Sequence, residues 1–315
     1  MRNIQADHPI QIEGVLNRQN VQDCTIVDIS IGHDDKIYIL LSERVPDRIR
    51  GMFVDTQANT GYYVIVMNVN WHTGELLSEE CYHLGIHLMN FHFVQPIGDE
   101  ILLLGSRARY GEPEPEKNAV IVAKTGKVIC SMCLGDGIER CIVTKDEKII
   151  TSYFDEGVFG NYGWDIPIGS CGLIVWDRNG NRLWENKHYN IYDCYALNVD
   201  DRENLWFCYY DAFVLVKLSG ADYREEAVYH PEYNGISWFG ITKDERFLVM
   251  DGGYNKHSEF WSARIVEDRL EEYEKTDILY QGKALLLKSY YFRGSKAVFW
   301  DNDNRLFAVE LYTMF

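Results

Sequence analysis

The sequence predicts an all-β fold built from six four-stranded units, and three observations lead to this prediction. A pattern of strand, short turn and strongly apolar strand recurs along the 315 residues. Hairpin turns that contain Gly or Asn follow most copies of this pattern. The chain also contains 21 Tyr, 14 Phe and 8 Trp, an excess of large flat side chains that suits sheets packed face to face.

The first hairpin of each unit is recognised by its turn, which is acidic in most copies. The six turns are centred on Asp34, Asp99, Asp146, Asp201, Asp244 and Gly294. They recur about every 50 residues and lie between runs of β-branched and aromatic residues. Second hairpins turn at 72–74, 124–126, 178–180 and 219–222. Each unit is therefore predicted to hold four antiparallel strands, called A to D here in chain order.

Four-stranded units of this period are typical of β-propeller blades. We therefore predict a six-bladed β-propeller that forms one domain over residues 1–315. The predicted blades cover residues 21–84, 85–136, 137–190, 191–234, 235–283 and 284–315. The last copy supplies only three strands, so we expect an N-terminal strand within residues 8–18 to complete it and close the ring.

On these six repeats, the chain resembles the six-bladed propeller superfamily that holds NHL-repeat proteins, YWTD-type receptor domains and gluconolactonase-like enzymes. The resemblance covers the whole chain but only its architecture. The NHL tripeptide, the YWTD motif and serial WD dipeptides are absent; Trp176-Asp177 and Trp300-Asp301 are isolated. The resemblance implies a fold with a binding face formed by loops, and it names no subfamily.

Charge and cysteine usage limit the possible partners and the compartment. The chain has 48 acidic against 31 basic residues, a formal charge of −17, which opposes binding to nucleic acid or an anionic membrane. Residues 1–10 lack the apolar run of a secretory signal, so a cytoplasmic protein is expected. Cys130 and Cys133 form the one C-x-x-C, but in a strand they point to opposite faces, so we expect no zinc there.

Loop length indicates which face carries a site. The predicted A–B turns are tight, whereas the B–C loops at 43–61, 107–118, 154–172 and 251–261 are long. Compact folds keep purely structural connections short. The face formed by the D–A and B–C connections is therefore the predicted binding face.

The segment 153–164 is the strongest single candidate on that face because it combines aromatic side chains, carboxylates and glycines. Stacking surfaces beside carboxylate acceptors suit a sugar, a cationic group or a peptide. The alternative is a packed loop whose aromatic side chains plug the mouth of the channel. The candidate ligand-binding residues, with one histidine from the same face, are Tyr153, Phe154, Asp155, Glu156, Phe159, Tyr162, Trp164 and His257.

Three carboxylates at equivalent D–A positions are candidate metal ligands. They are Asp23, Glu139 and Asp193. Carboxylates that converge on the channel could bind Ca²⁺ or another hard cation. They could equally be satisfied by backbone N–H groups or by Arg140.

The function expected from these features is a cytosolic propeller that binds a protein or a small polar or sugar-like ligand through its D–A/B–C face. No catalytic motif is recognised, so the expectation leans away from an enzyme. The alternative is a metal-assisted hydrolase or lyase acting on a sugar-like or lactone substrate, with Asp193, Glu139 and Asp155 as ligands or base.

Overall fold

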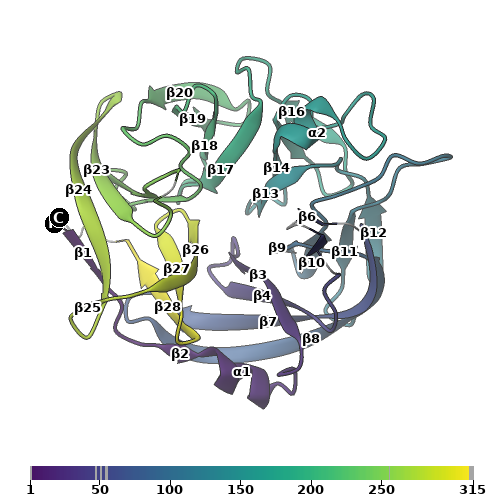
Figure 1. The fold of residues 1–315 in the computed structure, drawn as a ribbon, viewed down its shortest axis with the longest axis horizontal. Coiled ribbons are helices and arrows are strands. Elements are labelled where there is room, and N and C mark those ends of the chain that lie inside the picture. The colour runs from purple at the N-terminus through teal and green to yellow at the C-terminus, as the bar shows by residue number, and fades with distance from the viewer. Residues whose placement is uncertain (1, 47, 50–51, 54–55, 255, 312–315) are drawn as a thin grey trace. The chain divides into compact units, whose positions relative to one another are not determined.

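The structure is a computed structural model that describes residues 2–46, 48–49, 52–53, 56–254 and 256–311 (Figure 1). It is 53% strand and 4% helix, and its six blades of four antiparallel strands confirm the predicted six-bladed β-propeller. By its internal packing the chain divides into two compact units. Unit 1 comprises Met1–Arg18, Asn68–Ser78 and Tyr195–Phe315, and unit 2 comprises Gln19–Met67 and Glu79–Cys194.

The first three blades follow one another in simple meanders. Blade 1 holds β3 (Thr25–Ile31), β4 (Ile37–Ser42), β7 (Gln57–Asn70) and β8 (Glu75–Met89). Blade 2 holds β9 (Phe93–Ile97), β10 (Glu100–Leu104), β11 (Ala119–Val122) and β12 (Val128–Met132). Blade 3 holds β13 (Ile138–Val143), β14 (Ile149–Tyr153), β15 (Leu173–Trp176) and β16 (Arg182–Glu185). A two-stranded hairpin of β5 (Arg48–Ile49) and β6 (Met52–Phe53) lies in the first B–C loop, part of which falls outside the described residues.

The later blades have the same order with additions from the N-terminus. Blade 4 holds β17 (Asp193–Val199), β18 (Leu205–Tyr210), β19 (Leu215–Ser219) and β20 (Arg224–Tyr229). Blade 5 holds β21 (Phe239–Ile241), β22 (Phe247–Asp251), β23 (Phe260–Val266) and β24 (Arg269–Tyr280), joined by β25 (Lys283–Ala284). Blade 6 holds β26 (Leu287–Arg293), β27 (Lys296–Asp301) and β28 (Arg305–Glu310).

The N-terminal segment confirms the predicted closure but corrects its extent. Strand β2 (Ile10–Gln11) pairs with β28 in antiparallel register and so completes blade 6. The strand predicted over residues 8–18 ends there, because the following residues form helix α1 (Ile12–Arg18). Its buried side chains are Ile12, Val15 and Leu16. That i, i+3, i+4 spacing belongs to a helix, and it was obscured by the alternation of the apolar residues before it.

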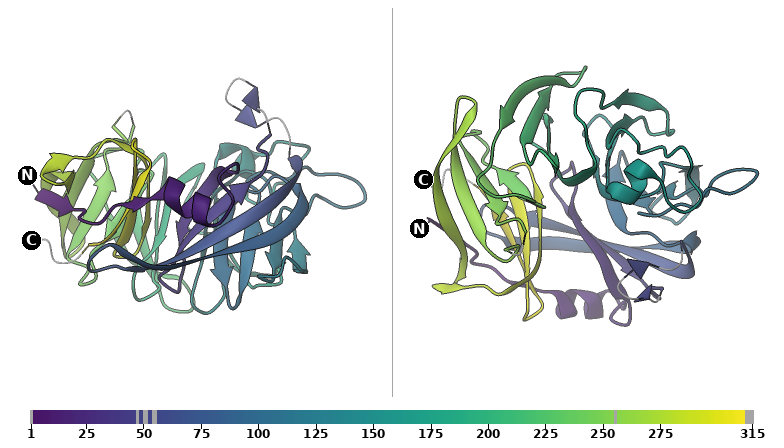
Figure 2. Two further views of the ribbon diagram at one scale, coloured as in Figure 1. Left: turned by 90° about the horizontal axis from the view of Figure 1, so that it is seen from below. Right: turned by 45° about the horizontal axis from the view of Figure 1, so that its top comes forward.

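Strand β1 (Arg2–Gln5) was not predicted; it pairs in parallel with β24 and extends blade 5 (Figure 2). Ile4 is fully buried there and packs in the core of unit 1 with Phe292 and Phe307. The Arg2 guanidinium lies 3.7 Å from Glu272 and 3.5 Å from Glu274. The acidic outer strand β24 is thus covered by a short strand that supplies one of its counter-charges.

The B strands hold the core, because sheets pack against both of their faces. All residues of β4, β14 and β22 are buried. Polar groups between neighbouring sheets are satisfied by direct bonds: Ser30 Oγ donates to Val94 O at 2.6 Å and Ser106 Oγ donates to Ile138 O at 2.6 Å. None of the described helices is long and apolar enough to cross a membrane.

If β1 is an integral strand of unit 1, Ile4→Ala should lower the free energy of unfolding by about 2 to 4 kcal/mol, the usual cost of truncating a fully buried Ile. The exposed neighbour Asn3 lies on the same strand, and Asn3→Ala should change stability by no more than about 0.5 kcal/mol. Urea unfolding followed by circular dichroism measures both. Equal, small effects would show that β1 contributes no packing.

Candidate binding loops and acidic cluster

Long connections between strands B and C are observed where they were predicted. In unit 2 they are loop 105–118 in blade 2 and loop 154–172 in blade 3, which contains helix α2 (Asp155–Phe159). In unit 1 the corresponding loop of blade 5 covers residues 252–259. The A–B turns have two to five residues, so the contrast in length between the two edges is confirmed.

A buried arginine, Arg107, holds the two long loops of unit 2 together. Its Nε and Nη2 donate to the two carboxylate oxygens of Asp136, both at 2.9 Å, and the Asp136 side chain is only 1% exposed. Nη2 also lies 2.6 Å from Glu156 Oε2. The guanidinium stacks over Tyr162 at 4.1 Å and Phe154 at 5.4 Å. Burial opposes the charge of Arg107, but the two carboxylates outweigh it and raise the Arg107 pKa.

This network gives structural partners to several predicted ligand-binding residues. Glu156, Tyr162 and Phe154 all contact Arg107 rather than standing free in solvent. The sequence did not single out Arg107, because nothing in a linear pattern marks an arginine that is buried by a distant aspartate. The nearest signal was the concentration of Asp, Glu and aromatic residues in loop 154–172.

Tyr153 and Trp164 also help to hold loops 105–118 and 154–172 in place, and we call this set of contacts around Arg107 the loop framework. Tyr153 is fully buried, and its hydroxyl donates to Leu134 O at 2.5 Å. Trp164 is 7% exposed; its Nε1 donates to Ala108 O at 2.8 Å, and its ring meets that of Tyr110 edge-on with centroids 5.1 Å apart. Tyr110 N in turn donates to Tyr162 O at 2.9 Å, so the two loops are joined through backbone as well as side chains.

A few apolar side chains of these loops remain exposed. Phe159 is 64% exposed, Tyr110 55% and Ile166 86%. The Phe159 ring lies 5.6 Å from the ring of Tyr192, which directly precedes Asp193. Well-held loops that expose large apolar groups are typical of an interaction surface, because the side chains are already ordered before a partner arrives.

Two of the three predicted metal ligands lie together, beside a predicted ligand-binding carboxylate. Burial, then the charges of Glu139 and Asp155, raise the pKa of Asp193 to about 7, against the pull of Arg140. Oδ1 of Asp193 is buried without a hydrogen-bond partner among the described residues. Burial also raises the pKa of Glu139, although Arg140 Nη1 lies 3.2 Å from its carboxylate. We call Glu139, Asp155 and Asp193 the acidic cluster.

The structure shows one more carboxylate with a raised pKa, Asp28, which was not predicted, and it places Asp23 outside the acidic cluster. Asp28, on β3, has its pKa raised to about 7 by burial, partly offset by hydrogen bonds such as Val94 N to Oδ2 at 3.0 Å. Asp23 is exposed, and it is not one of the charges that perturb Asp193. Across the described part of the chain, no group of three or more His, Cys, Asp or Glu side chains could hold a metal ion.

The last predicted residue, His257, lies in the loop of unit 1 beside a buried carboxylate. Asp251 is fully buried and accepts from Ser237 N and the Tyr290 hydroxyl, both at 3.1 Å, and from Gly253 N at 3.2 Å. His257 is exposed with Nδ1 3.5 Å from Asp251 Oδ2, and Tyr290 also donates to its carbonyl at 2.6 Å. Burial raises the Asp251 pKa.

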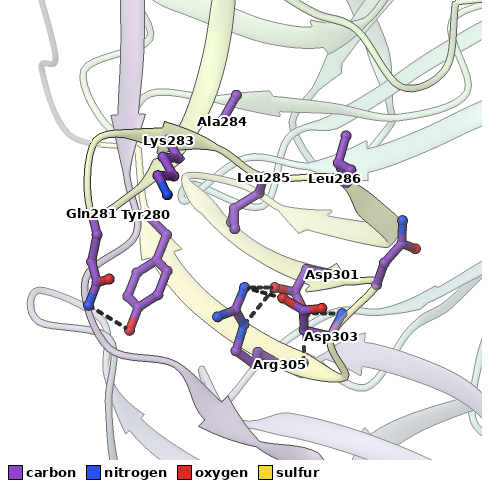
Figure 3. Close-up of a pocket in the computed structure, with 10 residues that line it drawn as sticks. Tyr280, Gln281, Lys283, Ala284, Leu285, Leu286, Asp301, Asp303 and Arg305 are labelled. Carbon is purple, nitrogen blue, oxygen red and sulfur yellow. Dashed lines mark hydrogen bonds and ion pairs between the residues drawn. The ribbon is translucent and has the colours of Figure 1, made fainter.

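A pocket of about 350 Å³ opens in unit 1 between the β24–β26 connection and the β27–β28 turn (Figure 3). Three of its charged groups pair with one another: Arg305 Nε donates to Asp301 at 2.7 Å, and Arg305 Nη2 lies 2.9 Å from Asp303. The Arg305 guanidinium also stacks over the Tyr280 ring at 5.0 Å. Asp301, Asp303 and Arg305 therefore compensate one another, and Lys283 is the other charged side chain that lines the pocket.

Comparison with known proteins supports the fold. A chain from the "Crystal Structure of Mitotic Checkpoint Complex" matches with a TM-score of 0.53 at 9% identity, covering 92% of this chain and 78% of the other. Hsv2 of Kluyvelomyces marxianus matches with a TM-score of 0.50 at 9% identity, covering 92% and 77%. KlHsv2 with loop 6CD replaced by a Gly-Ser linker also gives 0.50 at 9% identity, covering 91% and 78%.

The sequence comparisons are less informative. The YxzG family model matches residues 169–309, which is less than half of the chain. No curated protein matches the chain. The resemblance to the NHL, YWTD and gluconolactonase-like group therefore stays a prediction.

The Asp136 carboxylate should be essential for the loop framework. Asp136→Ala leaves the buried Arg107 with a weaker counter-charge and should lower the free energy of unfolding by about 3 kcal/mol in urea unfolding, with a change in Trp164 fluorescence. The control Glu114→Ala removes an exposed ion pair of the same loop and should cost less than about 0.5 kcal/mol. A cost below 1 kcal/mol for Asp136→Ala would contradict the assigned role.

Asp193 should make the protein less stable as the pH rises. The folded state holds a proton up to about pH 7 that the unfolded chain releases near its ordinary pKa of 3.8, so stability falls between those values. Between pH 5 and pH 8, the free energy of unfolding of Asp193→Asn should rise by about 1 to 2 kcal/mol relative to that of the wild type. Solvent screening of the partly exposed carboxylate keeps the difference this small. Urea unfolding at both pH values measures this, and exposed Asp165→Asn should show no such gain.

Proposed function

We propose that this protein is an interaction module that binds a basic, partly apolar segment of another protein through loops 105–118 and 154–172. One observation carries the proposal: loops fixed by the buried Arg107–Asp136 pair expose Tyr110, Phe159 and Ile166. Exposed apolar groups on an ordered framework lose little conformational entropy on binding, so their burial contributes to affinity.

The charge of the same region supports a cationic partner. The exposed Phe159 lies against Tyr192, next to Asp193 in the acidic cluster. Lys or Arg side chains of a partner would find there the exposed carboxylate of Asp155, whose charge also acts on Asp193. The formal charge of −17 would also speed the encounter with a basic partner.

The fold supports a role in binding other proteins, and the cysteines support a cytoplasmic location. One propeller of similar fold, at 9% identity, comes from the crystal structure of a mitotic checkpoint complex. None of the eight cysteines, all of which lie in the described residues, forms a disulfide, which is consistent with the reducing cytoplasm that we propose as the compartment.

A peptide array graded in charge and apolar content tests the proposed surface. We expect the wild type to favour peptides that combine Lys or Arg with aromatic or aliphatic residues, and the affinity to fall with added salt. Phe159→Ser with Ile166→Ser should weaken binding about tenfold or more, because the anchoring apolar area is lost.

Leu77→Ser is the matched control, since Leu77 is 57% exposed on β8 and belongs to unit 1, whereas both loops belong to unit 2. It should leave peptide binding unchanged. Binding that ignores peptide charge, or that falls equally in the control, would refute the proposed surface.

A further inference from the structure

Four aromatic side chains of unit 1 form a closed cycle at the D–A/B–C edge. Tyr195 lies near the start of β17, Tyr210 ends β18, Phe213 lies in the short loop that follows, and Tyr254 lies in loop 252–259 of blade 5. Each ring contacts two others of the set. We call these residues the four-ring cycle.

Neighbouring rings meet edge to face rather than in a stack, and each ring is called a wall of the cycle below. Consecutive centroids are 6.5 Å apart for Tyr195–Tyr210, 5.4 Å for Tyr210–Phe213, 5.9 Å for Phe213–Tyr254 and 5.8 Å for Tyr254–Tyr195. The matching interplanar angles are 68°, 84°, 86° and 81°. Corners of a square with sides of about 6 Å lie about 4 Å from its middle, within the reach of a cation–π contact.

The backbone is held in unusual conformations to place these rings. Phe213 has φ 53°, a region that bulky residues rarely adopt, and its N–H donates to Tyr209 O at 2.9 Å. Gly235 has φ 74°, and a Cβ there would lie 2.8 Å from the Tyr254 ring, so only glycine lets that ring take its place. The hydroxyls of Tyr195 and Tyr254 are hydrogen-bonded to each other, which fixes two neighbouring walls.

The cycle can be reached from solvent and offers negative ring faces. Tyr210 is 40% exposed and Tyr254 is 45% exposed. Among the described residues, no Lys or Arg lies over the rings of Tyr210, Phe213 or Tyr254, whereas such contacts occupy other rings, such as Lys288 over Trp300 at 3.8 Å. Aromatic faces arranged around one point attract a desolvated cation, and a large alkylated ammonium loses least hydration on entering.

We propose that the four-ring cycle binds an alkylated ammonium group, either of a small quaternary amine or of a methylated lysine side chain. The protein supplies the ring faces, and the net negative charge of the chain raises the local concentration of cations. The site stands on residues of unit 1 and does not depend on the interaction proposed for loops 105–118 and 154–172.

Titration with matched probes tests the site. Choline, its neutral isostere 3,3-dimethyl-1-butanol, and the amide of Nα-acetyl-Nε-trimethyl-lysine would be followed by saturation-transfer NMR and calorimetry. We expect at least one of the two cations to bind about tenfold or more tightly than the neutral alcohol. Preference for choline identifies a free amine as the source, and preference for the lysine derivative identifies a side chain.

Two variants, Tyr254→Leu and Phe213→Leu, remove one wall each. Either should abolish the roughly tenfold preference for a cation over the neutral alcohol. Tyr254→Phe keeps the wall and should bind within about threefold of the wild type. Tyr233→Leu, a partly exposed tyrosine of unit 1 outside the cycle, should have no effect. Equal binding of choline and the neutral alcohol, no binding of either cation at millimolar concentration, or retention of the preference in both Leu variants would overturn the proposal.

Discussion

The second strand of each blade has almost no solvent face, and the rest of the structure follows from this constraint. Every residue of β4 and β14 is buried, so polar atoms beside them must find protein partners, as Ser30 and Ser106 do with carbonyls of the next sheet. The blades therefore have little freedom to change. Chemistry that is specific to this protein must lie in the connections between strands, where length and composition can vary without disturbing the core.

The long loops solve the same problem of buried polarity at a smaller scale. Arg107 is largely buried, but its donors are taken up by Asp136 and Glu156, and its flat face is covered by Tyr162. Because these carboxylates and the aromatic ring contact the buried arginine, none of the three side chains is fully exposed to solvent. Phe159 and Ile166 differ from them, since both stay exposed. Exposing these apolar side chains does not stabilise the free protein, which favours a role for them in binding.

Sequence reasoning predicted what depends on local pattern and missed what depends on distant partners. The repeat of about 50 residues predicted six blades, and loop composition predicted where the long connections lie. It did not separate exposed Phe159 from buried Trp164, because Trp164 is buried against Ala108 and Tyr110 of another loop, and no local pattern records that contact. Nor could it find the four-ring cycle, whose members are up to 59 positions apart and come from two strands of blade 4, the short loop after them, and a loop of blade 5. Asp136 escaped for the same reason.

The two proposed surfaces handle positive charge by different physics, and this sets their response to pH. Ring faces keep their quadrupole over the range in which Asp193 titrates, so a cation in the four-ring cycle gains the same contact throughout that range. Asp193, with a pKa of about 7, carries a proton in part of the molecules at neutral pH. A cationic side chain bound beside it would favour the charged carboxylate and release that proton. The repulsion that destabilises the free acidic cluster would then become attraction for a partner.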